Sequence, residues 1–113
     1  MEKKEVLRRL GELEELRLAV KNIPLELRFC EPGKAQLLKK NLESARLRVR
    51  QLEGAMQVLT PEERLVIHRM CVVGEKGAAQ TLCQILQVEQ SSVYRRRDRA
   101  LRKLGNAMGG MEK

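Results

Sequence analysis

The chain has 113 residues and a net charge of +8, because 23 lysines and arginines outnumber 15 aspartates and glutamates. With one Phe, one Tyr and no Trp, the composition favours helix over sheet, and the length fits a single domain. Three cysteines without framework spacing, no apolar run near the roughly 20 residues of a membrane span, and no signal peptide predict a cytoplasmic protein without disulfides.

The positive charge is concentrated in two stretches of the chain. Residues 34–59 carry six basic and two acidic side chains, and residues 88–113 carry seven and three, so each stretch has a net charge of +4. The remaining residues balance to zero. Two basic helical segments are typical of a protein that binds a polyanion. A basic protein with no nucleic-acid partner is the plainer alternative.

Residues 2–22 are predicted to form an amphipathic helix. Apolar side chains recur there at steps of three and four residues: Val6, Leu10, Leu13, Leu16, Val20 and Ile23. Pro24 is expected to end or kink this helix. Residues 22–33 then form a connection, or a short strand, that ends in a Pro-Gly pair. We expect its apolar side chains to pack onto the neighbouring helices: Leu25, Leu27 and Phe29.

A second long helix over residues 35–59 carries a heptad seam. Its apolar positions follow steps of three and four without a break: Ala35, Leu38, Leu42, Ala45, Val49, Leu52, Met56 and Leu59. Such a seam needs a partner, either residues 2–22 folded back as an antiparallel hairpin or a second copy of the chain. We expect a hairpin together with a homodimer through this seam. The flanking basic side chains form either a solvated face or an auxiliary phosphate contact: Lys39, Lys40, Arg46, Arg48 and Arg50.

The C-terminal unit opens with a clear helix-start signal. Thr60 can cap a helix, Pro61 suits its first position, and Glu63 completes a Thr-x-x-Glu capping box. Two glycines, Gly74 and Gly77, bracket a break after this helix. A second helix is predicted over residues 78–86, a tight turn over 87–89, and a third helix over 90–108.

Two short helices joined by such a turn, the second strongly basic, are the pattern of a helix-turn-helix that reads DNA. Cys83 is small enough for the close approach of the two helices, and Val88 and Val93 are expected to lock them together. The candidate DNA-binding side chains are Gln90, Ser91, Ser92, Tyr94, Arg95, Arg96, Asp98, Arg99, Arg102 and Lys103.

We assign these candidates different roles. Arg95 is the first choice for base readout, because it lies two residues beyond the buried Val93 and should face outward. Ser91 and Ser92 suit phosphates at the helix start, and the basic residues further along suit phosphates that flank the groove: Arg99, Arg102 and Lys103. Asp98 is expected to form ion pairs that orient Arg95 or Arg102.

These residues resemble a known family. The segments 59–64, 92–95 and 99–104 are similar to region 4 of sigma-70-type factors, the domain that reads the −35 promoter element, and the resemblance covers roughly residues 58–105. It implies a four-helix DNA-binding fold with residues 90–108 in the major groove. The whole layout also resembles small ArpU- and RinA-like regulators of phages and integrated elements, which implies a transcription regulator rather than a complete sigma factor.

Three positions depart from the family pattern. Gln87 stands where the turn often has glycine, and Glu89 stands where a Ser or Thr usually caps the recognition helix. Arg96 occupies a position that is commonly apolar, so its stem is expected to pack while its head reaches solvent.

The sequence therefore predicts an all-α chain with a coiled-coil-like helical hairpin at residues 1–57 and a sigma-70 region 4-like helix-turn-helix bundle at residues 58–113. We expect a transcription regulator that binds double-stranded DNA in a sequence-specific way. No catalysis, cofactor or membrane contact is expected. No metal is expected either, since His68 and Cys71 alone do not make a zinc site. Two alternatives stay open: an adaptor that binds RNA polymerase or a sigma factor, and a small-terminase-like subunit for phage DNA packaging.

Overall fold

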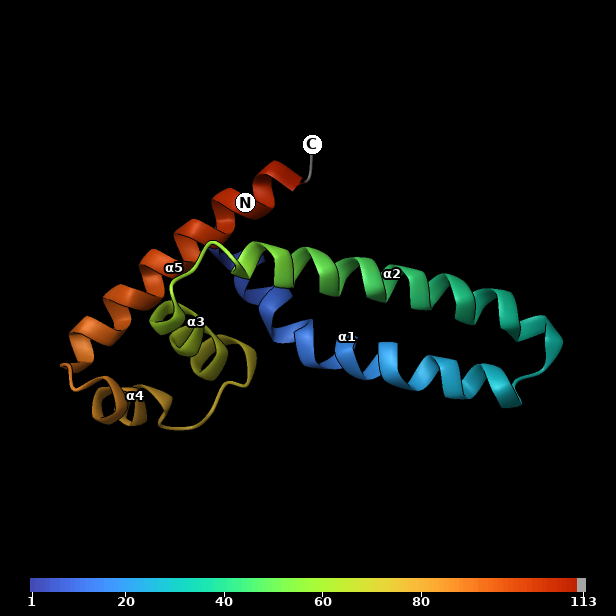
Figure 1. The fold of residues 1–113 in the computed structure, drawn as a ribbon, viewed down its shortest axis with the longest axis horizontal. Helices are drawn as coiled ribbons and strands as arrows, with labels where there is room; N and C mark the ends of the chain where they lie inside the picture. The colour runs from blue at the N-terminus through green and yellow to red at the C-terminus, as the bar shows by residue number, and fades with distance from the viewer. Residues whose placement is uncertain (112–113) are drawn as a thin grey trace.

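Every regular element in the described part of the chain is a helix (Figure 1). The computed structural model describes residues 1–111, with side chains up to residue 109. The elements are α1 (Lys3–Phe29), α2 (Pro32–Met56), α3 (Pro61–Ile67), the π-helical turn η1 (His68–Val72), α4 (Ala78–Leu86) and α5 (Gln90–Met111). A hairpin of α1 and α2 projects to one side, and α3 to α5 form a small bundle at its base. The predicted order of an all-α hairpin followed by a helical bundle is therefore confirmed.

The prediction that Pro24 separates a helix from a connection is wrong. α1 continues through Pro24 to Phe29, and the connection to α2 is only two residues long. A proline inside a helix removes one backbone donor and crowds the preceding turn, at a cost of about 3 kcal/mol. Packing against α2 offsets that cost, because Ile23 is buried and Leu27 is half-buried in the hairpin.

Two apolar side chains near the hairpin tip also depart from expectation. Leu25 and Phe29 are not buried against neighbouring helices and remain exposed. Both residues lie in the segment that was predicted to be a connection. Because this segment is helical, the helix points their side chains away from the interior. The basic side chains that flank the α2 seam are exposed as well, at all five positions.

The heptad seam of α2 lies against α1. Its central members are buried in the hairpin: Leu42, Ala45 and Leu52. An ion pair of 3.2 Å between Arg17 and Glu53 joins the two helices beside the seam. The predicted antiparallel hairpin thus uses the seam within one chain, and burial of its apolar surface stabilises the hairpin.

The main hydrophobic core lies where the base of the hairpin meets α5. It combines side chains from α1, α2, the loop after α2, α3, η1 and α5, among them Val6, Leu10, Leu13, Leu52, Leu59, Val72, Leu101 and Leu104. This one core crosses the predicted boundary between residues 57 and 58.

Within the described residues, no helix has both the length and the apolar character needed to cross a membrane.

The first residue of the chain also packs on α5. The Met1 amino group donates a hydrogen bond to the Gly105 carbonyl oxygen at 3.1 Å. A Cβ atom on Gly105 would lie 2.7 Å from the Met1 carbonyl oxygen, closer than atoms tolerate. Glycine at this position is therefore what allows the start of α1 to approach α5.

The predicted start of α3 and the break after it are both confirmed. The Thr60 hydroxyl accepts a hydrogen bond from the Glu63 N–H at 3.2 Å, and a Glu63 carboxylate oxygen accepts one from the Thr60 N–H at 2.9 Å. Gly74 and Gly77 have φ angles of +68° and +75°, a region that favours glycine. They turn the chain between η1 and α4.

Candidate nucleic-acid interface

A three-residue turn joins α4 to α5. Gln87 ends α4 with a φ of +56°, in the left-handed region. Its N–H donates to the Cys83 carbonyl oxygen, and the Val88 N–H donates to the same oxygen at 3.2 Å. The turn thus keeps the backbone shape that glycine would adopt most easily, although glutamine occupies the position.

A small second core fixes the orientation of α4 relative to α5. Val66, Leu82 and Val93 are fully buried and bring together α3, α4 and α5. Cys83 and Val88 pack against them. The predicted roles of Val88 and Val93 in locking the two helices are confirmed, and close packing of this kind holds a helix in one orientation.

The side of α5 opposite this core carries an exposed basic face. Arg95, Arg99 and Arg102 follow at steps of four and three residues, so they lie on one side of the helix. All three are exposed, and none has a hydrogen bond or ion pair within the described residues. Ser91 is also exposed and extends this face by one turn toward the start of α5. The three guanidinium groups can therefore bind phosphates or the edges of bases.

The start of α5 also borders an open cleft of about 510 Å³. Gln90 and Tyr94 line it from α5, whereas Lys76 and Gln80 line it from the loop before α4 and from α4 itself. Lys76 and Gln80 are not among the candidates that the sequence predicts, because only the fold brings them beside the start of α5. The sequence offered one signal for Lys76: Gly74 and Gly77 bracket it and predict a turn before α4. Ser92, on the other side of the helix, is half-buried.

Two cations predicted to bind DNA are already paired with α3. Arg96 forms an ion pair with Glu62, and the Lys103 ammonium lies 2.8 Å from a Glu63 carboxylate oxygen. Burial raises the pKa of Glu63, but the hydrogen bonds from Lys103 and Thr60 outweigh it and hold this pKa below its ordinary value. The first turn of α3 is therefore tied to α5 through these two pairs.

Asp98 also differs from the prediction that it orients Arg95 or Arg102. It accepts hydrogen bonds from Lys3 of α1 and from Arg97, each at 3.1 Å. The Lys3 hydrogen bond is the main reason why the pKa of Asp98 is lowered. Arg97 in turn lies over the ring of Tyr94, 4.9 Å from its centroid. A chain of contacts thus runs from the start of α1 to a side chain at the candidate interface.

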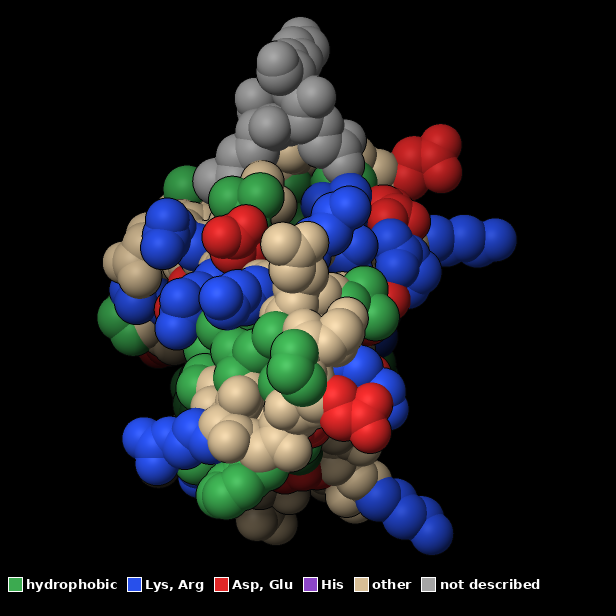
Figure 2. All heavy atoms as spheres, turned by 90° about the vertical axis from the view of Figure 1, so that its right-hand side faces the viewer, with side chains coloured by type: hydrophobic (Ala, Val, Ile, Leu, Met, Phe, Trp, Pro, Cys, Tyr) green, Lys and Arg blue, Asp and Glu red, His purple; other side chains and the backbone are tan. Residues whose placement is uncertain are grey.

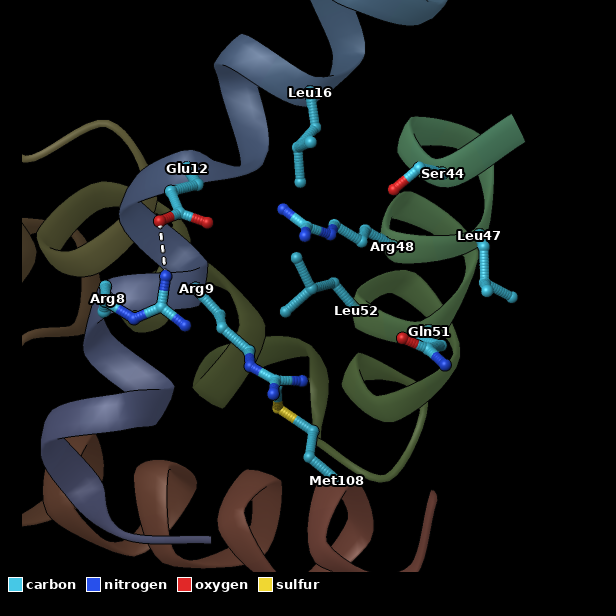
Figure 3. Close-up of a pocket in the computed structure, with 10 residues that line it drawn as sticks. All are labelled: Arg8, Arg9, Glu12, Leu16, Ser44, Leu47, Arg48, Gln51, Leu52 and Met108. Carbon is cyan, nitrogen blue, oxygen red and sulfur yellow. Dashed lines mark hydrogen bonds and ion pairs between the residues drawn. The ribbon is translucent and has the colours of Figure 1, made fainter. Parts of the chain in front are cut away.

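A pocket of about 320 Å³ lies elsewhere, between α1, α2 and α5 (Figure 3). The guanidinium group of Arg48 points into it beside Leu16 and Leu52, and Arg8 holds Glu12 at its rim through a 2.7 Å hydrogen bond.

The two side chains considered for zinc lie in η1: His68 is exposed, and burial raises the pKa of the Cys71 thiol. Among the described residues, no three His, Cys, Asp or Glu side chains gather as metal ligands.

Comparison with known proteins identifies no relative, since the chain matches no protein-family model, no curated protein and no solved structure. The chemistry of the candidate interface therefore rests on its own geometry. That geometry is a helix held by a short turn and a small core, with three unpaired arginines on its outer face.

Proposed function

We propose that this chain binds double-stranded DNA in a sequence-specific way and regulates transcription, with α5 in the major groove. The single observation that carries the proposal is the outward face of Arg95, Arg99 and Arg102, directly after the α4–α5 turn. A helix with its side chains is about 10–12 Å wide, and the major groove is about 12 Å wide, so the two match.

The roles of these side chains follow from their position along α5. Arg95 lies nearest the helix start and is proposed to donate two hydrogen bonds to a guanine, with Ser91, Gln90 and Tyr94 beside it. Arg99 and Arg102 lie further along and are proposed to bind phosphates. Arg96, Lys103 and Asp98 are proposed to act indirectly, because their pairs with α3 and α1 hold α5 in place.

The first experiment is selection of bound duplexes from a random library at two salt concentrations. We expect an enriched motif and an affinity that falls steeply with salt, because binding releases counterions from the DNA. Absence of any duplex binding at low salt would contradict the proposal. Binding to RNA polymerase under the same conditions would then favour the adaptor.

Three variants distinguish readout of bases from contact with phosphates. Arg95→Ala should lose about 1–3 kcal/mol on the selected motif, concentrated at one base pair. Arg99→Ala should weaken motif and random duplexes alike and reduce the salt slope by about 1. Arg46→Ala removes an exposed arginine of α2, outside the basic face of α5, and should leave affinity unchanged. Equal losses for Arg95→Ala on motif and random DNA would exclude its proposed role.

A further inference from the structure

The outer side of α1 carries a row of exposed apolar side chains. Leu7, Leu18, Leu25 and Phe29 are 36%, 56%, 51% and 88% exposed. They follow at steps of eleven, seven and four residues, which correspond to about three, two and one helical turns. The four side chains therefore line one side of α1, and we call this row the outer face.

The outer face takes no part in the hairpin. α1 presents Leu10, Leu13 and Ile23 to the interior instead, and all three are buried. The seam of α2 is also already occupied, because its central leucines are buried against α1. A dimer through the seam would need the hairpin to open, whereas the outer face is accessible with the hairpin closed.

The sequence of the outer face is complementary to itself in an antiparallel arrangement. If a two-fold axis passes beside Leu18, this residue meets Leu18 of the second copy. Leu7 lies eleven residues before the axis and Phe29 lies eleven after it, so each meets the other across the pair. Leu25 meets Gly11 of the second copy by the same rule, and the space above Gly11 is open to 4 Å. A large side chain thus faces a vacant position.

The charges beside the row favour the same arrangement. Glu14, which also pairs with Arg17 at 2.9 Å, lies four residues before Leu18 and Lys21 lies three after it, so an antiparallel pair brings Glu14 beside Lys21 of the second copy. Lys21 has no partner within the described residues. A parallel pair would instead place Glu14 beside Glu14 and Lys21 beside Lys21, and like charges across an interface are unfavourable. Arg8 comes near Arg28 of the second copy at the rim, but Glu5 and Glu12 already neutralise it.

The tip of the hairpin supplies further apolar surface at the Phe29 end of this row. Leu25 and Phe29 line an open groove of about 740 Å³ together with Leu37 and Leu38 of α2. Figure 2, which faces the tip, shows hydrophobic side chains in the middle of this end with Lys and Arg side chains around them. Leu7 of the second copy would lie at this groove, because it meets Phe29.

We propose that a second copy of this chain binds the outer face of α1, antiparallel and centred on Leu18. The contact runs from Leu7 to Phe29, over roughly 33 Å of helix. It places the two α3–α5 bundles at opposite ends of the dimer, where they can bind two inverted DNA half-sites. The evidence is independent of the proposed DNA binding, since none of these residues belongs to α5.

The oligomeric state of the full chain, measured by sedimentation without DNA, tests this proposal. We expect twice the chain mass of 13.0 kDa at about 100 μM. Leu18→Glu should raise the dissociation constant at least about 100-fold, because two buried leucines are lost and two carboxylates meet at the axis. Leu47→Glu is the matched control, since Leu47 is 54% exposed but lies on α2, outside the outer face and outside the groove at the tip. It should leave the mass unchanged.

A charge exchange tests the register. Glu14→Lys or Lys21→Glu alone should weaken the dimer about tenfold, and the double variant should restore it. The proposal is overturned if the wild type is a monomer at this concentration, if Leu18→Glu stays a dimer, or if the double variant fails to restore the mass. A monomer that still selects a DNA motif would refute the dimer and leave the proposed function standing.

Discussion

Replacing Lys103 with Met distinguishes a cation that stabilises the fold from one that binds DNA. Glu63 is 5% exposed, and one of its carboxylate oxygens accepts hydrogen bonds from Lys103 at 2.8 Å and from the Thr60 N–H at 2.9 Å. Its other oxygen is buried and has no hydrogen-bond partner. Without Lys103, the buried carboxylate keeps only the Thr60 hydrogen bond.

The size of the effect follows from this geometry. A hydrogen bond to a charged group contributes about 1.5–3 kcal/mol, but the Lys103 side chain is 40% exposed and water screens part of it. We therefore expect Lys103→Met to lower the free energy of unfolding by about 1–2 kcal/mol, and the melting temperature by roughly 4–8 °C. Met retains the apolar stem of lysine, so packing is preserved.

Urea unfolding followed by far-ultraviolet circular dichroism measures this change. Arg102→Met is the matched control, because Arg102 is the preceding residue, is exposed and has no partner within the described residues. It should change stability by less than about 0.5 kcal/mol. If Lys103→Met were as stable as the wild type, the pair with Glu63 would contribute nothing to the stability of the fold, contrary to the role assigned to Lys103.

The same pair predicts a pH dependence. The pKa of Glu63 is lowered in the folded chain, so its stabilising contribution is present above the ordinary value of 4.5 and is lost as pH falls through the lowered pKa. The stability difference between wild type and Lys103→Met should therefore be full at neutral pH and should shrink below pH 4.5. A difference that stays constant down to acid pH would contradict the assignment.

Three further variants test backbone positions. Gly105→Ala should destabilise the fold by about 1–3 kcal/mol, because its Cβ would lie 2.7 Å from the Met1 carbonyl oxygen. Gly33→Ala, in open space on α2, should instead stabilise the fold by about 0.4–1 kcal/mol. Thermal melts measure both changes, and equal effects at the two positions would exclude the close contact between Gly105 and Met1. Gln87→Gly should raise the unfolding free energy by about 0.5–1 kcal/mol, since glycine relieves the strain of the left-handed conformation. The gain is only partial, because glycine also loses more conformational entropy on folding than glutamine does. A loss of stability in urea unfolding would show that Gln87 is unstrained.

The sequence by itself determined the features whose partners lie close along the chain. The capping box joins Thr60 to a residue three positions away, and the two left-handed glycines after η1 need no distant contact. The α4–α5 turn is equally local, because the Gln87 N–H reaches a carbonyl one helical turn back. The seam of α2 also predicted that a partner helix is needed, since its regular spacing exposes one continuous apolar side, but it did not choose between α1 and a second copy.

Only the tertiary structure decided where α1 ends. The local rule at Pro24 predicted a break, and packing against α2 overrode it. As a result Leu25 and Phe29 belong to the outer face of a helix rather than to a buried connection. Ile23 and Leu27 do continue the helical spacing of the residues before them, but this spacing cannot show whether contacts with another helix outweigh the proline.

Tertiary structure also decided which cations of α5 remain available. Arg96 pairs with a residue 34 positions away, Lys103 with one 40 away, and Asp98 with one 95 away. Helical spacing fixes the side of α5 on which each charge lies, but not which carboxylate the fold brings beside it. The ten predicted site residues were therefore recognisable as one basic helix from the sequence. The division between Arg95, which is unpaired, and Lys103, which is not, depends on long-range ion pairs that exist only once α1 and α3 have packed against α5.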